Sequence, residues 1–80
     1  MKTIQVEYKK EKRNLTLQNA EYQMDIVLER LHQLFDIPPE ENICLKYEDT
    51  TGGLVSIATQ EMLLWCLGFP FKLKYKIVPA

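Results

Sequence analysis

Pro38 and Pro39 lie between two regular hydrophobic patterns, and they constrain the fold more than any other feature of the chain. Before them, apolar residues recur every three to four positions, which predicts an amphipathic helix over about residues 22–35. A residue that precedes proline is biased away from helical geometry, so this helix has to end at the proline corner. From Ile43 apolar and polar residues alternate, which predicts a strand. The sequence therefore indicates a helix and a strand joined by a sharp turn.

Two strand patterns precede the helix. Residues 3–9 alternate between apolar and polar side chains, residues 10–14 have the charge of an exposed turn, and Leu15 and Leu17 resume the alternation. Two such strands across a short turn predict a β-hairpin. Asn19 follows the second strand and is expected to cap the long helix.

The second half of the chain predicts a further hairpin, a short helix and a last strand. Residues 48–53 have the turn chemistry of a hairpin loop, and residues 54–57 form the short strand after it. Thr59 is a suitable cap for a short helix over residues 60–67, which Gly68 ends. Residues 71–77 alternate between apolar side chains and lysines. We therefore expect one α+β domain over residues 1–80, part of a larger protein, with a mixed four- to five-stranded sheet, one long helix and one short helix.

Residues 27–45, which hold the helix end, the Ile-Pro-Pro-acidic corner and the next strand, resemble the corresponding part of ubiquitin. The resemblance implies a ubiquitin-like β-grasp fold. Ubiquitin's own functional features are not found here: the chain does not end in Gly-Gly, and the strand from Ile43 presents Cys44 and Lys46 on its polar side. We therefore expect neither conjugation nor ubiquitin's partner-binding patch.

The segment from Leu45 to Met62 resembles the acidic motif of Phox/Bem domains, which are β-grasp modules that pair with one another. The positions that match the motif are Tyr47, Asp49, Gly52, Val55, Ile57, Thr59 and Glu61. The family's acidic subtype carries further carboxylates in the loop, where this chain has Thr50, Thr51 and Gly53. On the acidic side the resemblance leaves Glu48, Asp49 and Glu61 as partner-binding residues.

The basic subtype of the same family carries a lysine late in the first strand. Lys9 holds that place, and Lys10, Lys12 and Arg13 lie beside it. The resemblance implies that these residues meet carboxylates of a partner. We also expect Lys72, Lys74 and Lys76 to share one outer sheet face with Lys9, while Glu40, Glu41, Glu48 and Asp49 gather at the other end. A solvated hairpin turn is the alternative interpretation of the basic cluster.

Composition and charge exclude several function classes. A net charge of −1 argues against nucleic-acid binding, and no apolar run is long enough to span a membrane. Cys44 and Cys66 have no metal-site spacing, so we expect reduced thiols in a cytoplasmic protein, with one disulfide as the alternative. His32 is the only histidine, and no nucleophile and base can be assembled around it. We expect no cofactor and no catalysis.

The function that follows is a non-catalytic protein–protein interaction module in a signalling or scaffold protein, with an acidic Phox/Bem-like domain as partner. The alternative is a Ras-association-like domain that binds a small GTPase by pairing an edge strand, residues 14–18, with the GTPase sheet. Intramolecular packing against a neighbouring domain is also open. The short helix carries more large apolar residues, among them Trp65 and Leu67, than eight residues can bury, so an apolar patch beside it is a second candidate interface.

Overall fold

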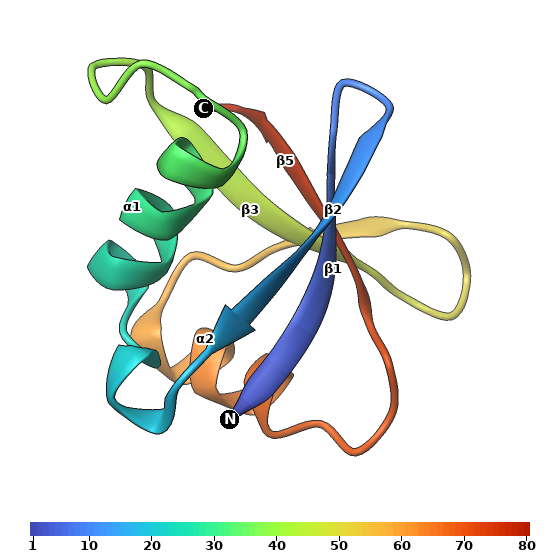
Figure 1. Ribbon diagram of the computed structural model, residues 1–80. Coiled ribbons are helices and arrows are strands. Elements are labelled where there is room, and N and C mark those ends of the chain that lie inside the picture. The colour runs from blue at the N-terminus through green and yellow to red at the C-terminus, as the bar shows by residue number, and fades with distance from the viewer.

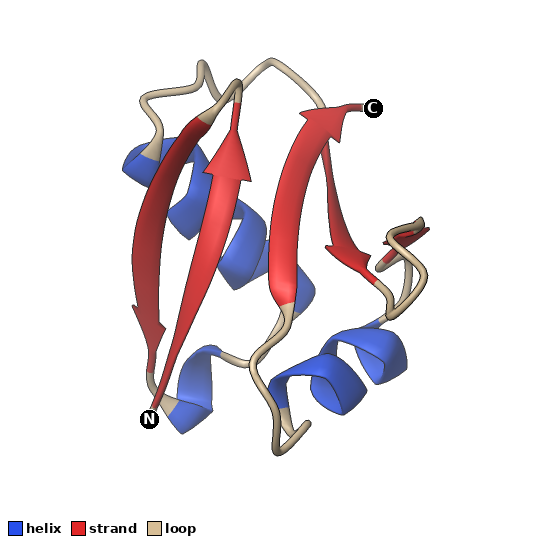
Figure 2. Ribbon diagram, turned by 90° about the vertical axis from the view of Figure 1, so that its right-hand side faces the viewer, coloured by secondary structure: helices blue, strands red, loops and turns tan.

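A computed structural model describes residues 1–80 and shows a mixed five-stranded sheet with one face covered by the long helix (Figure 1). The elements are β1 (Lys2–Tyr8), β2 (Glu11–Leu17), a 3-10 helix (Asn19–Glu21), α1 (Met24–Leu34), β3 (Ile43–Glu48), β4 (Leu54–Ser56), α2 (Gln60–Leu67) and β5 (Lys74–Pro79). The strand order is β2-β1-β5-β3-β4, in which β1 and β5 are parallel and the other pairs antiparallel (Figure 2). The predicted α+β architecture is confirmed.

One apolar core lies between the sheet and the two helices. Every buried side chain is apolar apart from the hydroxyl of Tyr75 and the thiol of Cys66, and none is charged. The alternation predicted for the strands places their buried residues on a single sheet face, where they meet the buried residues of α1. The core consists of Ile4, Val6, Leu15, Leu17, Val27, Leu31, Phe35, Ile37, Leu45, Ile57, Leu63, Cys66, Leu67, Tyr75 and Ile77.

The β1–β2 turn consists of Lys9 and Lys10 alone, so the turn predicted over residues 10–14 is wrong. Tyr8 is paired with Glu11, and β2 begins there. The φ angles of Lys9 and Lys10 are 49° and 69°. Positive φ at both central residues is the signature of a type I′ turn, whose twist matches that of the flanking strands. Because the turn lacks the Asn-Gly usual at such positions, the sequence did not reveal it.

The start of α1 also differs from expectation, because Asn19 does not cap it. Residues Asn19–Glu21 form a 3-10 helix instead, and the Gln18 N–H donates to a carboxylate oxygen of Glu21 at 2.8 Å. α1 begins at Met24, with Gln23 as an N-cap that makes no side-chain capping bond. Asn19 caps neither helix: Gln18 is the N-cap of the 3-10 helix, and the Asn19 side-chain oxygen accepts a hydrogen bond from the Met1 ammonium group at 3.3 Å.

The end of α1 is set by hydrogen bonds as well as by the prolines. The Ile37 N–H donates to the His32 carbonyl at 2.8 Å and the Asp36 N–H to the Gln33 carbonyl at 3.4 Å. Asp36 has φ 57°, so these bonds form a Schellman motif with Asp36 at the left-handed position. Pro38 follows directly, and the predicted corner is confirmed.

The last strand begins later than its alternation predicted. β5 starts at Lys74, whereas Phe71 is 71% exposed and lies outside the strand. Residues 68–73 first carry the chain away from α2, and Pro70 in this segment has no N–H to pair. The side chain of Lys2 donates to the Phe69 carbonyl at 2.9 Å and ties this segment to β1. None of the helices reaches the length and apolar character that crossing a membrane requires.

Candidate interaction surfaces

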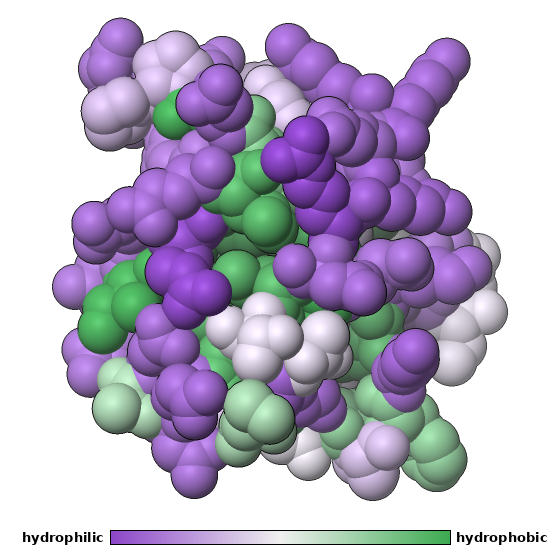
Figure 3. Space-filling view, viewed as in Figure 1, coloured by the Kyte–Doolittle hydropathy of each residue, from purple (hydrophilic) through white to green (hydrophobic).

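The four predicted basic residues, Lys9, Lys10, Lys12 and Arg13, lie together at one end of the sheet, and we call them the basic end. Hydrophilic side chains project from this end in the space-filling view, at the upper right where the β1–β2 turn runs (Figure 3). All four residues are exposed. Their side chains nevertheless divide between the two faces of the sheet.

Lys9 was expected to point away from the face that carries Tyr8, and the structure overturns this. Its ammonium nitrogen lies 5.3 Å from the centre of the Tyr8 ring. Tyr8 in turn packs edge-on against Phe35 of the core at 5.6 Å. The reason is the left-handed backbone of the turn, which interrupts the strand alternation at Tyr8. Lys9 therefore does not share the outer sheet face with Lys74 and Lys76.

Arg13 lies on the helix side of β2, where its guanidinium is already engaged. It donates to the Leu34 carbonyl at the end of α1 at 2.5 Å, and its Cζ atom lies 5.6 Å from the Phe35 ring centre. It also bonds Glu11, through Nε at 2.8 Å and through a closer Nη2 contact. A cation at a helix C-terminus is favourable, because the last carbonyls carry partial negative charge. Arg13 thus stabilises the junction between β2 and α1.

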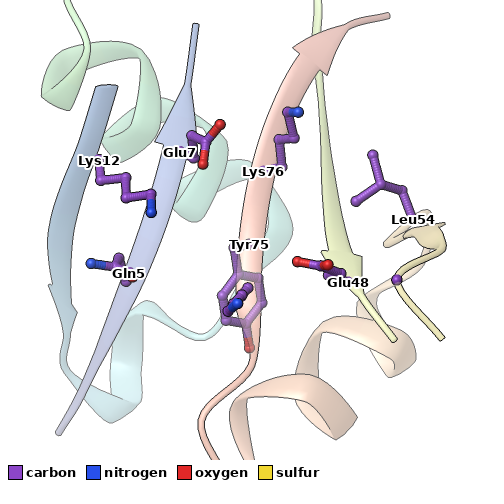
Figure 4. A pocket seen from close by; sticks show the side chains of 9 residues that line it. Gln5, Glu7, Lys12, Glu48, Leu54, Tyr75 and Lys76 are labelled. Carbon is purple, nitrogen blue, oxygen red and sulfur yellow. The ribbon is translucent and has the colours of Figure 1, made fainter. Parts of the chain in front are cut away.

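Lys12 lies on the outer sheet face, in a row of charges that crosses four strands. Glu7 is the cross-strand neighbour of both Lys12 and Lys76, and it lies between them in Figure 4. Lys46 is directly opposite Lys76 on β3. Lys12, Glu7 and Lys76 line a shallow cavity of about 280 Å³, together with Lys74 and Glu48. With three lysines to one glutamate, this part of the outer face is basic.

The predicted acidic residues lie at the opposite end of the sheet. Glu48 ends β3, Asp49 begins the β3–β4 loop, and Glu61 lies in the first turn of α2. Glu40 and Glu41 do not join them: they precede Ile43, at the end of β3 that is paired with Pro79. Glu40 and Glu41 precede β3 and Glu48 ends it, so the full length of this strand separates the two groups of carboxylates. The expected gathering of all four carboxylates is therefore wrong.

Asp49 organises its own loop. One of its carboxylate oxygens accepts hydrogen bonds from the Thr51 hydroxyl at 2.7 Å, the Thr51 N–H at 2.9 Å and the Gly53 N–H at 2.9 Å. These bonds, the Thr51 hydroxyl first, hold the pKa of Asp49 below its ordinary value. Gly52 completes the loop with φ 85°. Asp49 is therefore an exposed, ionised and firmly positioned carboxylate.

A row of four aromatic rings runs beside α2, and we call Tyr47, Trp65, Phe69 and Phe71 the aromatic row. Neighbouring ring centres are 6.0, 5.2 and 5.7 Å apart in that order. Trp65 is 55% and Phe71 71% exposed, whereas Leu67 is buried. The predicted apolar patch beside the short helix thus exists, but it centres on Trp65 and the segment after the helix. The sequence pattern missed Phe71, because its alternation placed this residue in a strand.

The buried polar groups offer little chemistry. Burial raises the pKa of the Tyr75 hydroxyl well above its usual range, and the adjacent Cys66 contributes. Burial also raises the pKa of the Cys66 thiol. Both groups are therefore protonated near neutral pH and are poor nucleophiles. Cys44 and Cys66 are free thiols.

Comparisons with known proteins place this geometry in a structural class. No protein-family model and no curated protein sequence matches the chain. A structure of the AtNBR1-PB1 domain superimposes with a TM-score of 0.74 at 18% identity, covering 98% of this chain and 96% of that one. A cryo-EM structure of the AtNBR1-PB1 filament (L-type) superimposes with a TM-score of 0.77 at the same identity and coverage. This chain therefore has the ubiquitin-like β-grasp fold seen in PB1, the Phox/Bem1 domain.

Proposed function

We propose that this domain is a non-catalytic protein–protein interaction module within a cytoplasmic signalling or scaffold protein. The basic end docks an acidic surface of the partner, such as that of another PB1 domain. The fold it shares with AtNBR1-PB1 supports this class of function. Charge complementarity of this kind steers encounter and selects partners.

The observation that carries the proposal is the pair of lysines in the β1–β2 turn. Lys9 and Lys10 both have left-handed φ angles, which cost a side chain other than glycine about 1–2 kcal/mol per residue. Asn-Gly is the sequence that a type I′ turn prefers. Strained backbone of this kind persists mainly where a function requires the residue. Two lysines at these positions favour a role for their charge over the stability of the turn.

The other predicted residues contribute unequally. Lys12 extends the basic end onto the outer face, toward Lys76. Arg13 is committed to Leu34 and Glu11, so we assign it the positioning of β2 in addition to its charge. Lys10 and Lys12 are then the main contacts, with Lys9 beside them.

A second candidate is self-assembly through unlike ends. The basic end and the group Glu48, Asp49 and Glu61 lie at opposite ends of the sheet, and unlike surfaces that meet head to tail generate open chains. AtNBR1-PB1 has been observed as a filament. The β3–β4 loop has a single carboxylate beside Glu48, that of Asp49, which makes this acidic end weak. Heterotypic docking is therefore the first proposal.

The alternative of a Ras-association-like domain gains no support from either similar structure. β2 is an edge strand, as that alternative requires. Its residues Glu11, Lys12 and Arg13 place dense charge along that edge, which disfavours pairing with a further strand. Binding to a GTPase that depends on the GTP state would restore this alternative.

The test is calorimetric titration of the domain against a panel of PB1 domains, starting with AtNBR1-PB1. Binding should weaken with added salt, and the double substitution K10Q/K12Q should reduce the affinity by at least tenfold for a desolvated contact. Replacing two lysines at the far end, K72Q/K74Q, is the matched control with the same change in charge. Equal effects of the two variants would show that only net charge matters and would refute a specific basic end.

A further inference from the structure

The outer face of the sheet holds a pair of like charges near its centre. Lys46 of β3 is directly opposite Lys76 of β5, and directly opposite residues of an antiparallel pair have their side chains on the same face. The other charged cross-strand neighbours join opposite signs: Glu7–Lys12, Glu7–Lys76 and Glu48–Lys74. Lys46–Lys76 is therefore the one place in the sheet register where like charges meet.

The structure does little to offset this repulsion. Both lysines are half-buried, so water and salt screen their charges less than at a fully exposed position. On its other side Lys46 is paired with Ser56 of β4, which brings no charge. Neither ammonium group takes part in an ion pair of the structure. Like charges directly opposite one another destabilise a sheet, and sequences break such rules mainly at functional sites.

The like-charge pair continues the basic end across the sheet. Figure 4 shows Lys12, Glu7 and Lys76 on one face of neighbouring strands, and Lys46 is next in the register. Adjacent strands lie about 4.8 Å apart, so the row from Lys12 on β2 to Lys46 on β3 is about 14 Å long. Its three ammonium groups outnumber its one carboxylate. An extended acidic segment of about four residues would span the row.

The chemistry of this face fits a protein partner better than a nucleic acid. All three tyrosines of the strands, Tyr8, Tyr47 and Tyr75, pack on the core side. The strands therefore offer no outward ring on which a base could stack, as single-stranded nucleic acids require. The net charge of −1 also opposes a polyphosphate chain, whereas it permits local pairing with a few carboxylates.

We propose that the partner's acidic segment runs from the basic end across the outer sheet face and places a carboxylate between Lys46 and Lys76. This inference rests on the proposed function and names the part of the partner that the β1–β2 turn alone does not define. A carboxylate between two ammonium groups accepts hydrogen bonds from both. The repulsion that weakens the free domain is then replaced by attraction in the complex. Folding and binding therefore make opposite demands on Lys46.

The first test compares the thermal unfolding of K46Q and K74Q, two variants with the same change in charge. K46Q removes only the repulsion and should raise the melting temperature by roughly 1–8 °C, as expected for one cross-strand pair in a domain of this size. K74Q removes the attraction to Glu48 and should lower the melting temperature. A melting temperature that K46Q leaves unchanged or lowers would refute the destabilising pair.

The second test titrates the domain with octaglutamate, a probe that supplies carboxylates on a short chain. K46Q/K76Q should raise the dissociation constant roughly two- to thirtyfold, as expected for the loss of two exposed ion pairs. K72Q/K74Q has the same change in charge and should have a clearly smaller effect. In NMR spectra of the wild-type domain, the ammonium resonances of Lys46 and Lys76 should shift as octaglutamate is added.

Three results would overturn the inference. Equal effects of the two double variants, or ammonium resonances of Lys46 and Lys76 that do not shift, would exclude an acidic segment on the outer face. Tighter binding of octameric oligothymidylate than of octaglutamate would assign the row to a nucleic acid. If K10Q/K12Q weakens a PB1 partner and K46Q/K76Q does not, the basic end stands and the inference fails. If only K46Q/K76Q weakens that partner, the basic end fails and the outer face remains.

Discussion

Gln60, the first residue of α2, caps the start of α1: its side-chain oxygen accepts a hydrogen bond from the Met24 N–H at 2.9 Å. The amide nitrogen of the same side chain donates to the Tyr22 carbonyl at 2.6 Å. One side chain therefore satisfies an orphan donor of α1 and an acceptor in the preceding turn. Gln23, the N-cap by position, supplies no such bond. The two helices are thus joined by a capping interaction between distant segments.

Gln60→Ala should lower the free energy of unfolding by about 0.5–2 kcal/mol, the usual effect of losing a capping side chain. Gln23→Ala is the control, and its effect should stay within about 0.5 kcal/mol. Urea denaturation monitored by the fluorescence of Trp65 measures both. Equal losses for the two variants would show that Gln60 does not cap α1 in solution.

Leu31→Ala should destabilise the domain by about 2–5 kcal/mol, because it removes a fully buried side chain and leaves a cavity. Leu64→Ala removes the same atoms from a side chain that is 46% exposed, and we expect a clearly smaller loss. The two variants are compared by their denaturant midpoints, with the slope of unfolding free energy against denaturant concentration the same for both. A loss below half a kcal/mol for Leu31→Ala would mean that α1 presents another face to the sheet.

Replacing the turn lysines by the sequence that suits their backbone should separate stability from binding. K9N/K10G should raise the free energy of unfolding by about 1–2 kcal/mol, since asparagine and glycine tolerate positive φ and the lost Lys9–Tyr8 contact is weaker. The same variant should bind an acidic PB1 partner less tightly. Thermal unfolding and calorimetry provide the two measurements. A variant that is less stable than the wild type would contradict the strained turn.

Asp49 should make stability depend on pH in the acid range. Its pKa is lowered in the folded state, so its contribution is fully present above the unfolded pKa and is lost as the pH falls through the folded pKa. Glu21, whose pKa its bonds to Gln18 and Arg30 also lower, adds to the same trend. Asp49→Asn should make the acid limb of a plot of unfolding free energy against pH shallower. An unchanged slope would show that the loop bonds do not favour the ionised carboxylate.

The strand alternation, the helix periodicity and the proline corner were sufficient to predict the architecture, because each reflects burial of one face. The predictions failed where a local signal competed with tertiary structure. Phe71 continues an alternating pattern, yet the chain needs this segment to reach β1 before β5 can pair. Asn19 has the chemistry of a helix cap, but a glutamine 41 positions later caps α1 instead. Such choices depend on contacts that sequence spacing does not contain.

The candidate sites were predicted as residue types and only partly as positions. Asp49 lies in a loop, as expected, whereas Lys12 was expected in a turn and lies within β2. The direction of Lys9 was not predictable, since the left-handed turn interrupts the strand alternation. Arg13 shares a strand face with Leu15 and Leu17, and its direction was missed because residues 10–14 were interpreted as a turn. The roles of all predicted site residues in binding remain predictions. The aromatic row combines residues from β3, α2 and the segment after it, so no single pattern marked it.

The parallel pairing of β1 with β5 places the first and last strands of the sequence side by side in the middle of the sheet. Without β5, the hairpin of β1 and β2 has no bond to β3 and β4. The sheet therefore cannot be completed on the ribosome until β5 has emerged, and the half-made domain exposes two unpaired edges meanwhile. Contacts so distant in sequence also slow folding, because the whole intervening chain has to be closed into a loop. Loss of β5 by proteolysis would consequently divide the sheet in two and unfold the domain.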